Sequence, residues 1–118
     1  MLLNKLYTLE SIHEKDAVIH ASVRFNPDHK IYEGHFPGQP VTPGVIQIQI
    51  VKEILQKHMN RKFWLKSMKT CKFLQIIDPQ VTPLIDIEIK FTEGELLDVV
   101  ASGGYGETVY FKMQSSYR

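Results

Sequence analysis

The chain has 118 residues, of which 43% are hydrophobic and 23% are charged, and its formal net charge is +1. This length fits one domain that can bury a core without disulfides or a metal. The composition excludes a disordered or fibrous chain. The single cysteine, Cys71, excludes an internal disulfide framework and a cysteine-rich zinc site. We therefore expect one globular domain over residues 1–118.

Charge and hydropathy narrow the classes of partner. A near-neutral net charge gives no overall reason to expect nucleic acid, and no apolar run approaches the roughly 20 residues that span a bilayer. The opening residues lack the features of a secretory signal, so we expect a cytoplasmic protein without membrane insertion. A local basic cluster is either a solvated face or a surface for an acidic partner, and it comprises Lys57, Arg61, Lys62, Lys66, Lys69 and Lys72.

Two segments of alternating polarity open the chain. Residues 6–12 and 17–25 are predicted to be the strands of a hairpin that turns around residues 14–16. A polar Asn-Pro-Asp sequence then ends the second strand. A loop that holds four of the six prolines follows as far as Pro43.

The segment after this loop is ambiguous on pattern alone. Residues 45–51, VIQIQIV, alternate strictly and are rich in β-branched side chains, which favours a strand locally. Context favours a helix, because Thr42 is an acceptable N-cap, Pro43 suits the first helical position, and apolar residues continue at helical spacing to Leu55. We predict a helix over residues 43–58 that other structure surrounds, since it is apolar almost all round. Its narrow polar strip consists of Gln49, Lys52, Glu53 and Gln56.

The rest of the chain is predicted to be strands, at residues 63–73, 84–92, 96–102 and 108–116, separated by turn sequences. The order is therefore two strands, one long helix and four strands. This order predicts an α+β domain in which a curved antiparallel sheet wraps around a single helix.

The loop EGHFPGQPVTPGV, residues 33–45, carries the most chemical information. Its three prolines and its glycines restrict or permit particular backbone torsions and so hold His35 in place. The N–H of Gly44, in the first helical turn, is expected to be an unpaired donor at the positive end of the helix dipole, where it can bind a carbonyl oxygen. Histidine is suited to proton transfer near neutral pH. A fixed histidine beside a helix N-terminal N–H donor favours enolate chemistry on a carbonyl compound.

Structural roles are the alternative for each candidate residue. A single loop histidine is often structural, and no other histidine has metal-ligand spacing; residues 13–16, HEKD, are interpreted as a polar turn. Gln47 lies in the apolar arc of the helix and needs a hydrogen-bond partner, which nearby backbone could supply. Trp64 and the tyrosines are predicted to be core or interface residues.

Residues 34–45, GHFPGQPVTPGV, resemble the signature of the FabZ-type 3-hydroxyacyl-acyl-carrier-protein dehydratases of the hot-dog fold superfamily. In that family a His-Phe-Pro-Gly loop precedes a Pro-Gly-Val helix start, and residues 69–91 look like the strand, turn and strand that follow the helix. The resemblance implies a hot-dog domain in which His35 is the catalytic histidine and Gly44 N–H polarises the thioester carbonyl. We then expect substrate contacts from Phe36, Gly38, Pro43 and Val45.

Gln49 is the departure from the family pattern. In the family, the helix supplies a carboxylate fourteen residues after the histidine, which reaches a histidine on the partner subunit and assists the departure of the hydroxyl as water. Here the position is Gln49. An amide can bind a hydroxyl or a water but cannot supply an acid proton, and losing a general acid costs about 10²- to 10⁴-fold in rate. The chain is therefore a slow enzyme, an enzyme in which Glu53 or Glu33 takes over part of the role, or a scaffold that no longer catalyses.

We predict a dehydratase or hydratase, a lyase, that acts on 3-hydroxyacyl thioesters carried by acyl carrier protein or coenzyme A. The alternative is a weak or inactive subunit that binds acyl thioesters or pairs with an active relative. A hot-dog thioesterase is a further alternative, to which Gln49 gives no support. The resemblance also implies a homodimer or a larger assembly, such as a trimer of dimers, with an acyl tunnel shared between subunits. It implies no metal, organic cofactor or nucleic acid.

Overall fold

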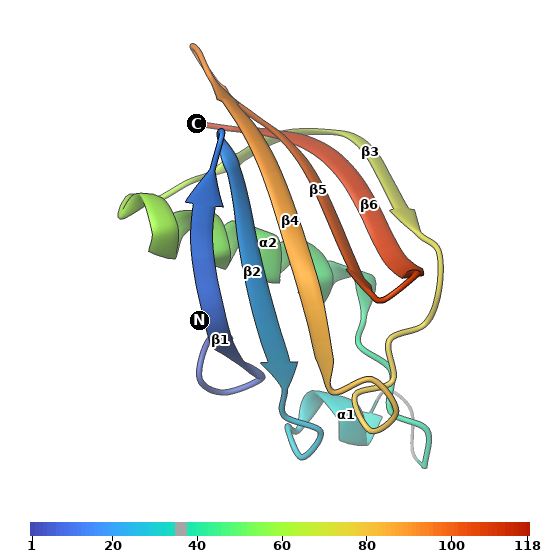
Figure 1. Ribbon diagram of the computed structural model, residues 1–118. Helices are drawn as coiled ribbons and strands as arrows, with labels where there is room; N and C mark the ends of the chain where they lie inside the picture. Colours follow the sequence, from blue (N-terminus) through green and yellow to red (C-terminus); the bar gives the residue numbers. More distant parts are fainter. Residues whose placement is uncertain (35–37) are drawn as a thin grey trace.

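Within the described residues, 1–34 and 38–118 of a computed structural model, one antiparallel sheet of six strands curves around one long helix (Figure 1). This arrangement confirms the predicted α+β hot-dog fold. The elements are, in chain order, β1 (Tyr7–Lys15), β2 (Val18–Phe25), α1 (Ile31–Gly34), α2 (Gly44–Met59), β3 (Leu65–Phe73), β4 (Leu84–Glu93), β5 (Leu97–Tyr105) and β6 (Thr108–Tyr117).

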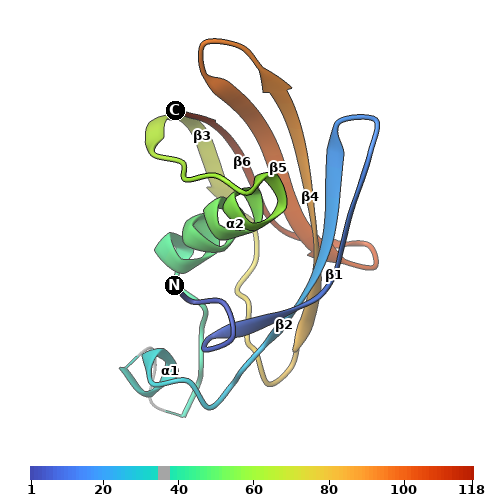
Figure 2. The ribbon, with the colours of Figure 1, turned by 90° about the vertical axis from the view of Figure 1, so that its left-hand side faces the viewer.

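The strand order in the sheet is β1-β2-β4-β5-β6-β3, and every neighbouring pair is antiparallel. β1 and β3 are therefore the two edges. Figures 1 and 2 show α2 lying across the concave side of the sheet. No element of the described chain covers the other face, so its polar side chains remain in contact with solvent.

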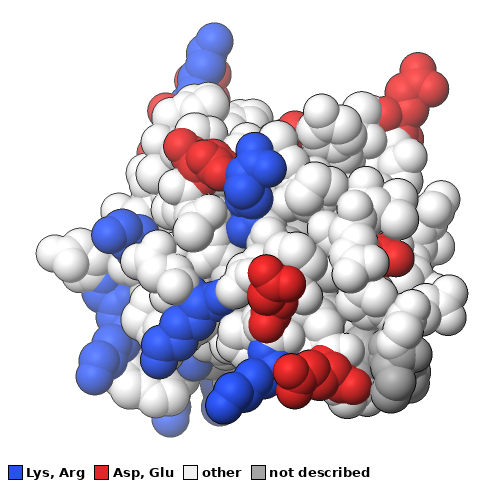
Figure 3. Space-filling model, turned by 90° about the horizontal axis from the view of Figure 1, so that it is seen from below, with Lys and Arg blue, Asp and Glu red and all other residues white. Residues whose placement is uncertain are grey.

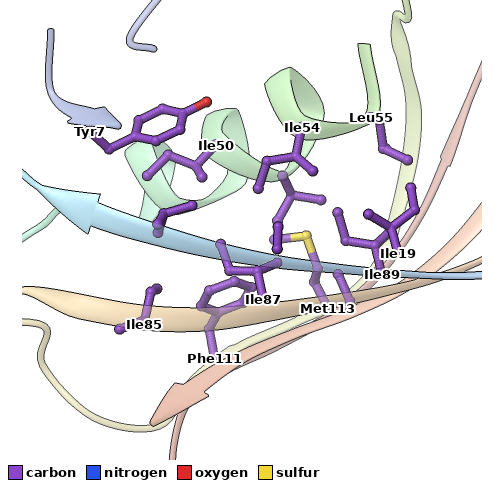
Figure 4. Packing of buried hydrophobic residues seen from close by; sticks show 14 of the residues in the cluster. Tyr7, Ile19, Ile50, Ile54, Leu55, Ile85, Ile87, Ile89, Phe111 and Met113 are labelled. Carbon is purple, nitrogen blue, oxygen red and sulfur yellow. The ribbon is translucent and has the colours of Figure 1, made fainter. Parts of the chain in front are cut away.

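Strand alternation determines which side chains face α2. In β2 the residues at odd positions are buried, and Ala21 pairs with Ile87 of β4, so both strands place aliphatic side chains on the same face. Each buried aliphatic side chain contributes about 1.5–3 kcal/mol. Figure 4 shows the residues that meet between the two layers: Ile50, Ile54 and Leu55 of α2 with Ile19, Ile85, Ile87, Ile89, Phe111 and Met113 of the sheet.

The predicted long helix is present, but its first turn differs from the prediction. The N-cap is Pro43 in an extended conformation, and no side chain of the part of the chain that the structure describes caps the helix. Thr42 is not the cap, because its hydroxyl is hydrogen-bonded to that of Tyr32 at 2.8 Å. At the other end, Asn60 adopts a left-handed conformation, with φ 53°, and ends the helix close to the predicted place.

Two further segments differ from the sequence predictions. The loop predicted after β2 contains α1, whose Tyr32 is buried. β1 continues to Lys15, and the hairpin turns at Asp16 and Ala17, whose φ angles are 54° and 62°. His13 is therefore a strand residue and not part of a polar turn.

Trp64 is 58% exposed, so it is not in the core of this chain. No helix in the described ranges is long and apolar enough to cross a membrane.

Candidate active site

The start of α2, at Gly44, is the place where the sequence analysis expects a donor for a carbonyl oxygen. Pro43 O accepts hydrogen bonds from Ile46 N at 3.1 Å and from Gln47 N at 3.2 Å. Gly44 is the first residue of the helix, so its N–H lies at the positive end of the helix dipole. No side chain in residues 1–34 or 38–118 caps this end. His35 and Phe36 lie outside the described residues.

The packing around Gly44 explains why this position is glycine. A Cβ atom placed there would lie 2.5 Å from Cζ of Phe73, the last residue of β3. The ring of Phe73 therefore covers the Cα of Gly44, while Val45 beside it is 70% exposed. Gly38 is exposed and has a positive φ of 76°, which favours glycine. Gly44 thus has a packing role in addition to the role predicted for its N–H.

A pocket of about 440 Å³ opens beside the loop that leads to α2. Its lining includes Gln39, Pro40 and Val41 of this loop, together with Ile76 and Val81. Both Ile76 and Val81 are exposed apolar residues. The lining is partly apolar and partly polar, and it includes no residue of α2.

Gln47 has only half of the hydrogen bonding that a buried amide needs. Its side chain is buried, and Nε2 donates to the backbone oxygen of Thr42 at 3.1 Å, as the sequence interpretation allowed. Its Oε1 atom has no hydrogen-bond partner within the described part of the chain. A buried acceptor without a donor costs about 1–3 kcal/mol.

Gln49 is linked to a fully buried carboxyl group. Its Nε2 donates to Oε2 of Glu53 at 3.0 Å, one helical turn away. Glu53 also accepts from Leu2 N at 3.0 Å, from Leu3 N at 2.9 Å and from the hydroxyl of Tyr7 at 3.1 Å. We call these five residues the Glu53 cluster.

The Glu53 cluster argues against Glu53 as a replacement acid. Glu53 has no exposed surface, and both of its oxygens accept hydrogen bonds from the protein. Burial, followed by the negative charge of Glu53 and the hydrogen bond to it, raises the pKa of Tyr7 well above its usual value. Tyr7 is therefore a protonated donor. Glu33 is exposed on α1, and no contact described for it indicates a role.

The other chemically active side chains have structural partners elsewhere. His13 and His20 stack with ring centroids 5.1 Å apart, and His58 lies 2.7 Å from Glu14. Burial raises the pKa of the Cys71 thiol, which disfavours the nucleophilic thiolate. Among the residues the structure describes, no group of three His, Cys, Asp or Glu could hold a metal ion.

Comparison with known proteins places the chain in a family. Residues 11–104 match the model of the ApeI-like family, described as ApeI dehydratase. The chain belongs to the ApeI-like dehydratase family. The Dehydratase Heterocomplex ApeI:P from Xenorhabdus doucetiae has a similar structure, with a TM-score of 0.75 at 20% identity over 92% of this chain and 95% of that one. This likeness shows that the present chain has the same fold as the matched chain of that complex.

Curated relatives of this ApeI-like chain are 3-hydroxyacyl-[acyl-carrier-protein] dehydratases named FabZ. The protein from Clostridium acetobutylicum is 32% identical over 87 residues, which are 68% of this chain and 60% of the relative. The protein from Novosphingobium aromaticivorans is 27% identical over 84 residues, 64% of this chain and 52% of the relative. The chain thus spans about half to three fifths of the length of these relatives.

Proposed function

We propose that this ApeI-like chain dehydrates 3-hydroxyacyl thioesters and catalyses the reverse hydration. The observation that carries the proposal is the start of α2 at Gly44, which no side chain of the described residues caps and which follows the His35 loop in the sequence. A helix start of this kind stabilises negative charge on a carbonyl oxygen. Gly44 N–H then polarises the thioester carbonyl, and His35 is the acid and base.

In the proposed reaction, His35 makes both proton transfers. His35 removes a proton from C2, and the enolate oxygen that forms is stabilised by Gly44 N–H. The bond from C3 to the hydroxyl oxygen then breaks, and His35 returns the proton to the leaving oxygen, which gives the enoyl thioester and water. Gln49 binds the hydroxyl but supplies no proton. Because a separate acid is missing, the rate is about 10²- to 10⁴-fold below that of a site with a carboxyl group.

The proposed substrate is carried by acyl carrier protein or coenzyme A, both of which are anionic. The name of the Clostridium relative contains acyl carrier protein. Lys66, Lys69 and Lys72 are exposed on β3, and Lys72 lies directly opposite Lys112 of β6. Like charges opposite each other in a sheet are destabilising, and a negatively charged partner would relieve their repulsion. These lysines support a local docking site for an anionic carrier.

The face seen from below in Figure 3 is of mixed charge, and its Lys and Arg side chains lie mainly on the side away from β3. Asp and Glu side chains are spread over both halves of this face. A mixed surface of this kind agrees with the near-neutral net charge.

A partner subunit without catalysis is the second candidate function. Gln49, in place of the family's carboxylate, favours it. The matched Xenorhabdus structure is itself a heterocomplex. In this case, the chain binds the acyl thioester or completes the site of a related subunit that carries the carboxylate.

The test is hydration of a crotonyl thioester by the purified protein, followed by the loss of enoyl-thioester absorbance. We expect slow turnover in the wild type, none in His35→Ala and faster turnover in Gln49→Glu. His20→Ala is the matched histidine control, because His20 stacks on His13 in the hairpin of β1 and β2, and it should keep wild-type activity.

Two results would change the proposal. Turnover that survives His35→Ala would remove His35 from the mechanism. An inactive wild type with an active Gln49→Glu variant would mean that the scaffold has lost its acid, and this outcome would favour the partner-subunit function.

A further inference from the structure

The Glu53 cluster determines how the side-chain amide of Gln49 is oriented. Among the described residues, four groups bond to the carboxyl oxygens of Glu53, and each is a donor: two backbone N–H groups, the hydroxyl of Tyr7 and Nε2 of Gln49. A carboxyl group surrounded by donors acts through its oxygens as an acceptor. If the amide of Gln49 were reversed, its oxygen would face another acceptor. The NH₂ end therefore faces Glu53, and the carbonyl oxygen is the opposite end of the amide.

The carboxyl group that holds Gln49 in this orientation is itself held by burial and hydrogen bonds. Glu53 has no exposed surface, and it is fixed both by α2 and by the turn at the start of the chain. That turn is itself closed by hydrogen bonds, because Lys5 N and Leu6 N both donate to Leu2 O. Gln49 is partly exposed, so its free end can contact a ligand while the other end is held.

We propose that Glu53 is a positioning residue that acts through Gln49 and presents the carbonyl oxygen of Gln49 to the reacting hydroxyl or water. The inference rests on the proposed function and specifies the role of the amide in it. The 3-hydroxyl group donates its hydrogen to Gln49 Oε1, which leaves the lone pairs of the hydroxyl oxygen free to receive the proton from His35. In hydration, a water donates a hydrogen bond to Gln49 Oε1 and gives its other proton to His35 as its oxygen attacks C3. His35 then delivers that proton to C2 of the enolate, which gives the 3-hydroxyacyl thioester.

The first test needs no turnover. The two amide protons of Gln49 are assigned by ¹⁵N NMR from their disappearance in Gln49→Ala. In the wild type, we expect one of them to be shifted downfield by its bond to the carboxylate, and we expect Glu53→Gln to remove that shift. A resonance that is the same in wild type and Glu53→Gln would overturn the inference. This result is independent of whether the wild type is active.

A milder variant covers the case in which Glu53→Gln does not fold. Tyr7→Phe keeps the carboxylate but removes one of its donors. The remaining donors then bind a less saturated acceptor, so the Gln49 resonance should move further downfield. A resonance that does not move would contradict the inference.

The second test separates positioning from stability. Glu53→Gln should lower kcat about tenfold with little change in KM, corresponding to the loss of about one hydrogen bond in the transition state. The same substitution should have no effect on kcat in a Gln49→Ala background. An equal loss of kcat in both backgrounds would mean that Glu53 is structural only.

The matched control lies on the same helix. Gln56 accepts a hydrogen bond from Phe63 N at 3.0 Å, and none of the described hydrogen bonds links its side chain to the Glu53 cluster. Gln56→Ala should lower the melting temperature and leave kcat unchanged. A wild type without turnover would refute the proposed function, while the NMR result would still decide the orientation of Gln49.

Discussion

Tyr7 shows how a single residue connects the start of the chain to α2. Its hydroxyl donates to Glu53 at 3.1 Å, and both side chains are buried. Tyr7→Phe removes the hydroxyl and leaves the ring in place. We expect the free energy of unfolding to fall by about 1–3 kcal/mol, because a buried hydrogen bond is lost. Chemical denaturation would measure the change.

The control for this prediction is Tyr105→Phe. Tyr105 is 53% exposed at the end of β5, so removing its hydroxyl should change stability by less than about 0.5 kcal/mol. Equal stabilities of Tyr7→Phe and the wild type would show that the hydroxyl contributes nothing to the Glu53 cluster.

At the scale of single residues, the sequence singled out Gln49 as the departure from the family pattern, but it did not predict the surroundings of Gln49. Gln49 was identifiable by its distance along the chain from His35, and its spacing from Glu53 indicated a shared helical strip. The burial of Glu53 was not predictable from that strip. Its partners Leu2, Leu3 and Tyr7 are 51, 50 and 46 residues away in the sequence, and only the folded chain brings them together.

At the scale of elements, α2 shows that burial can override local propensity. Its sequence VIQIQIV alternates like a strand, yet the structure is helical and buries Ile50, Val51, Ile54 and Leu55. This apolar set, read at helical spacing, gave the correct prediction. α1 was missed because only four residues form it, and its buried Tyr32 is held by Thr42 from outside the segment.

Gly103 is a second element-scale feature, since it controls the packing of β5 on β6. A Cβ atom at Gly103 would lie 2.3 Å from Cε1 of Phe111, its partner in the sheet. Phe111 is fully buried and cannot move without disturbing the core. We expect Gly103→Ala to lower the free energy of unfolding by about 1–3 kcal/mol through overpacking.

Thermal or chemical unfolding would test this prediction against Gly94→Ala. The nearest atom to a Cβ at Gly94 is the backbone oxygen of Leu96 at 3.6 Å, an ordinary contact. The Gly94 variant should therefore be much closer to the wild type. If both variants lost the same stability, the ring of Phe111 would not be the cause.

At the scale of the whole molecule, one edge of the sheet carries an unusual amount of apolar surface. β3 has no strand on its outer side within the described chain, and the exposed apolar residues on and beside it are Trp64, Leu65, Phe73, Leu74 and Ile76. Because the ring of Phe73 covers Gly44, a chain bound at this edge would also lie next to the start of α2. An uncovered edge strand is a template for pairing with another strand.

We therefore expect the wild-type protein to be at least a dimer of its 13.6 kDa chain, paired along β3. Leu74→Asp places a charge in the expected interface, where burial without a partner costs several kcal/mol, and it should weaken the dimer by at least about 100-fold. Sedimentation over a range of concentrations would measure the change.

The control for the dimer is Val100→Asp, on the uncovered outer face of the sheet. Val100 is 52% exposed, as Leu74 is 50% exposed, so the two substitutions add the same charge at similar exposure. Val100→Asp should sediment like the wild type, because its face takes no part in pairing along β3. A monomeric wild type, or equal weakening by both variants, would contradict pairing at this edge and leave the site at Gly44 within a single chain.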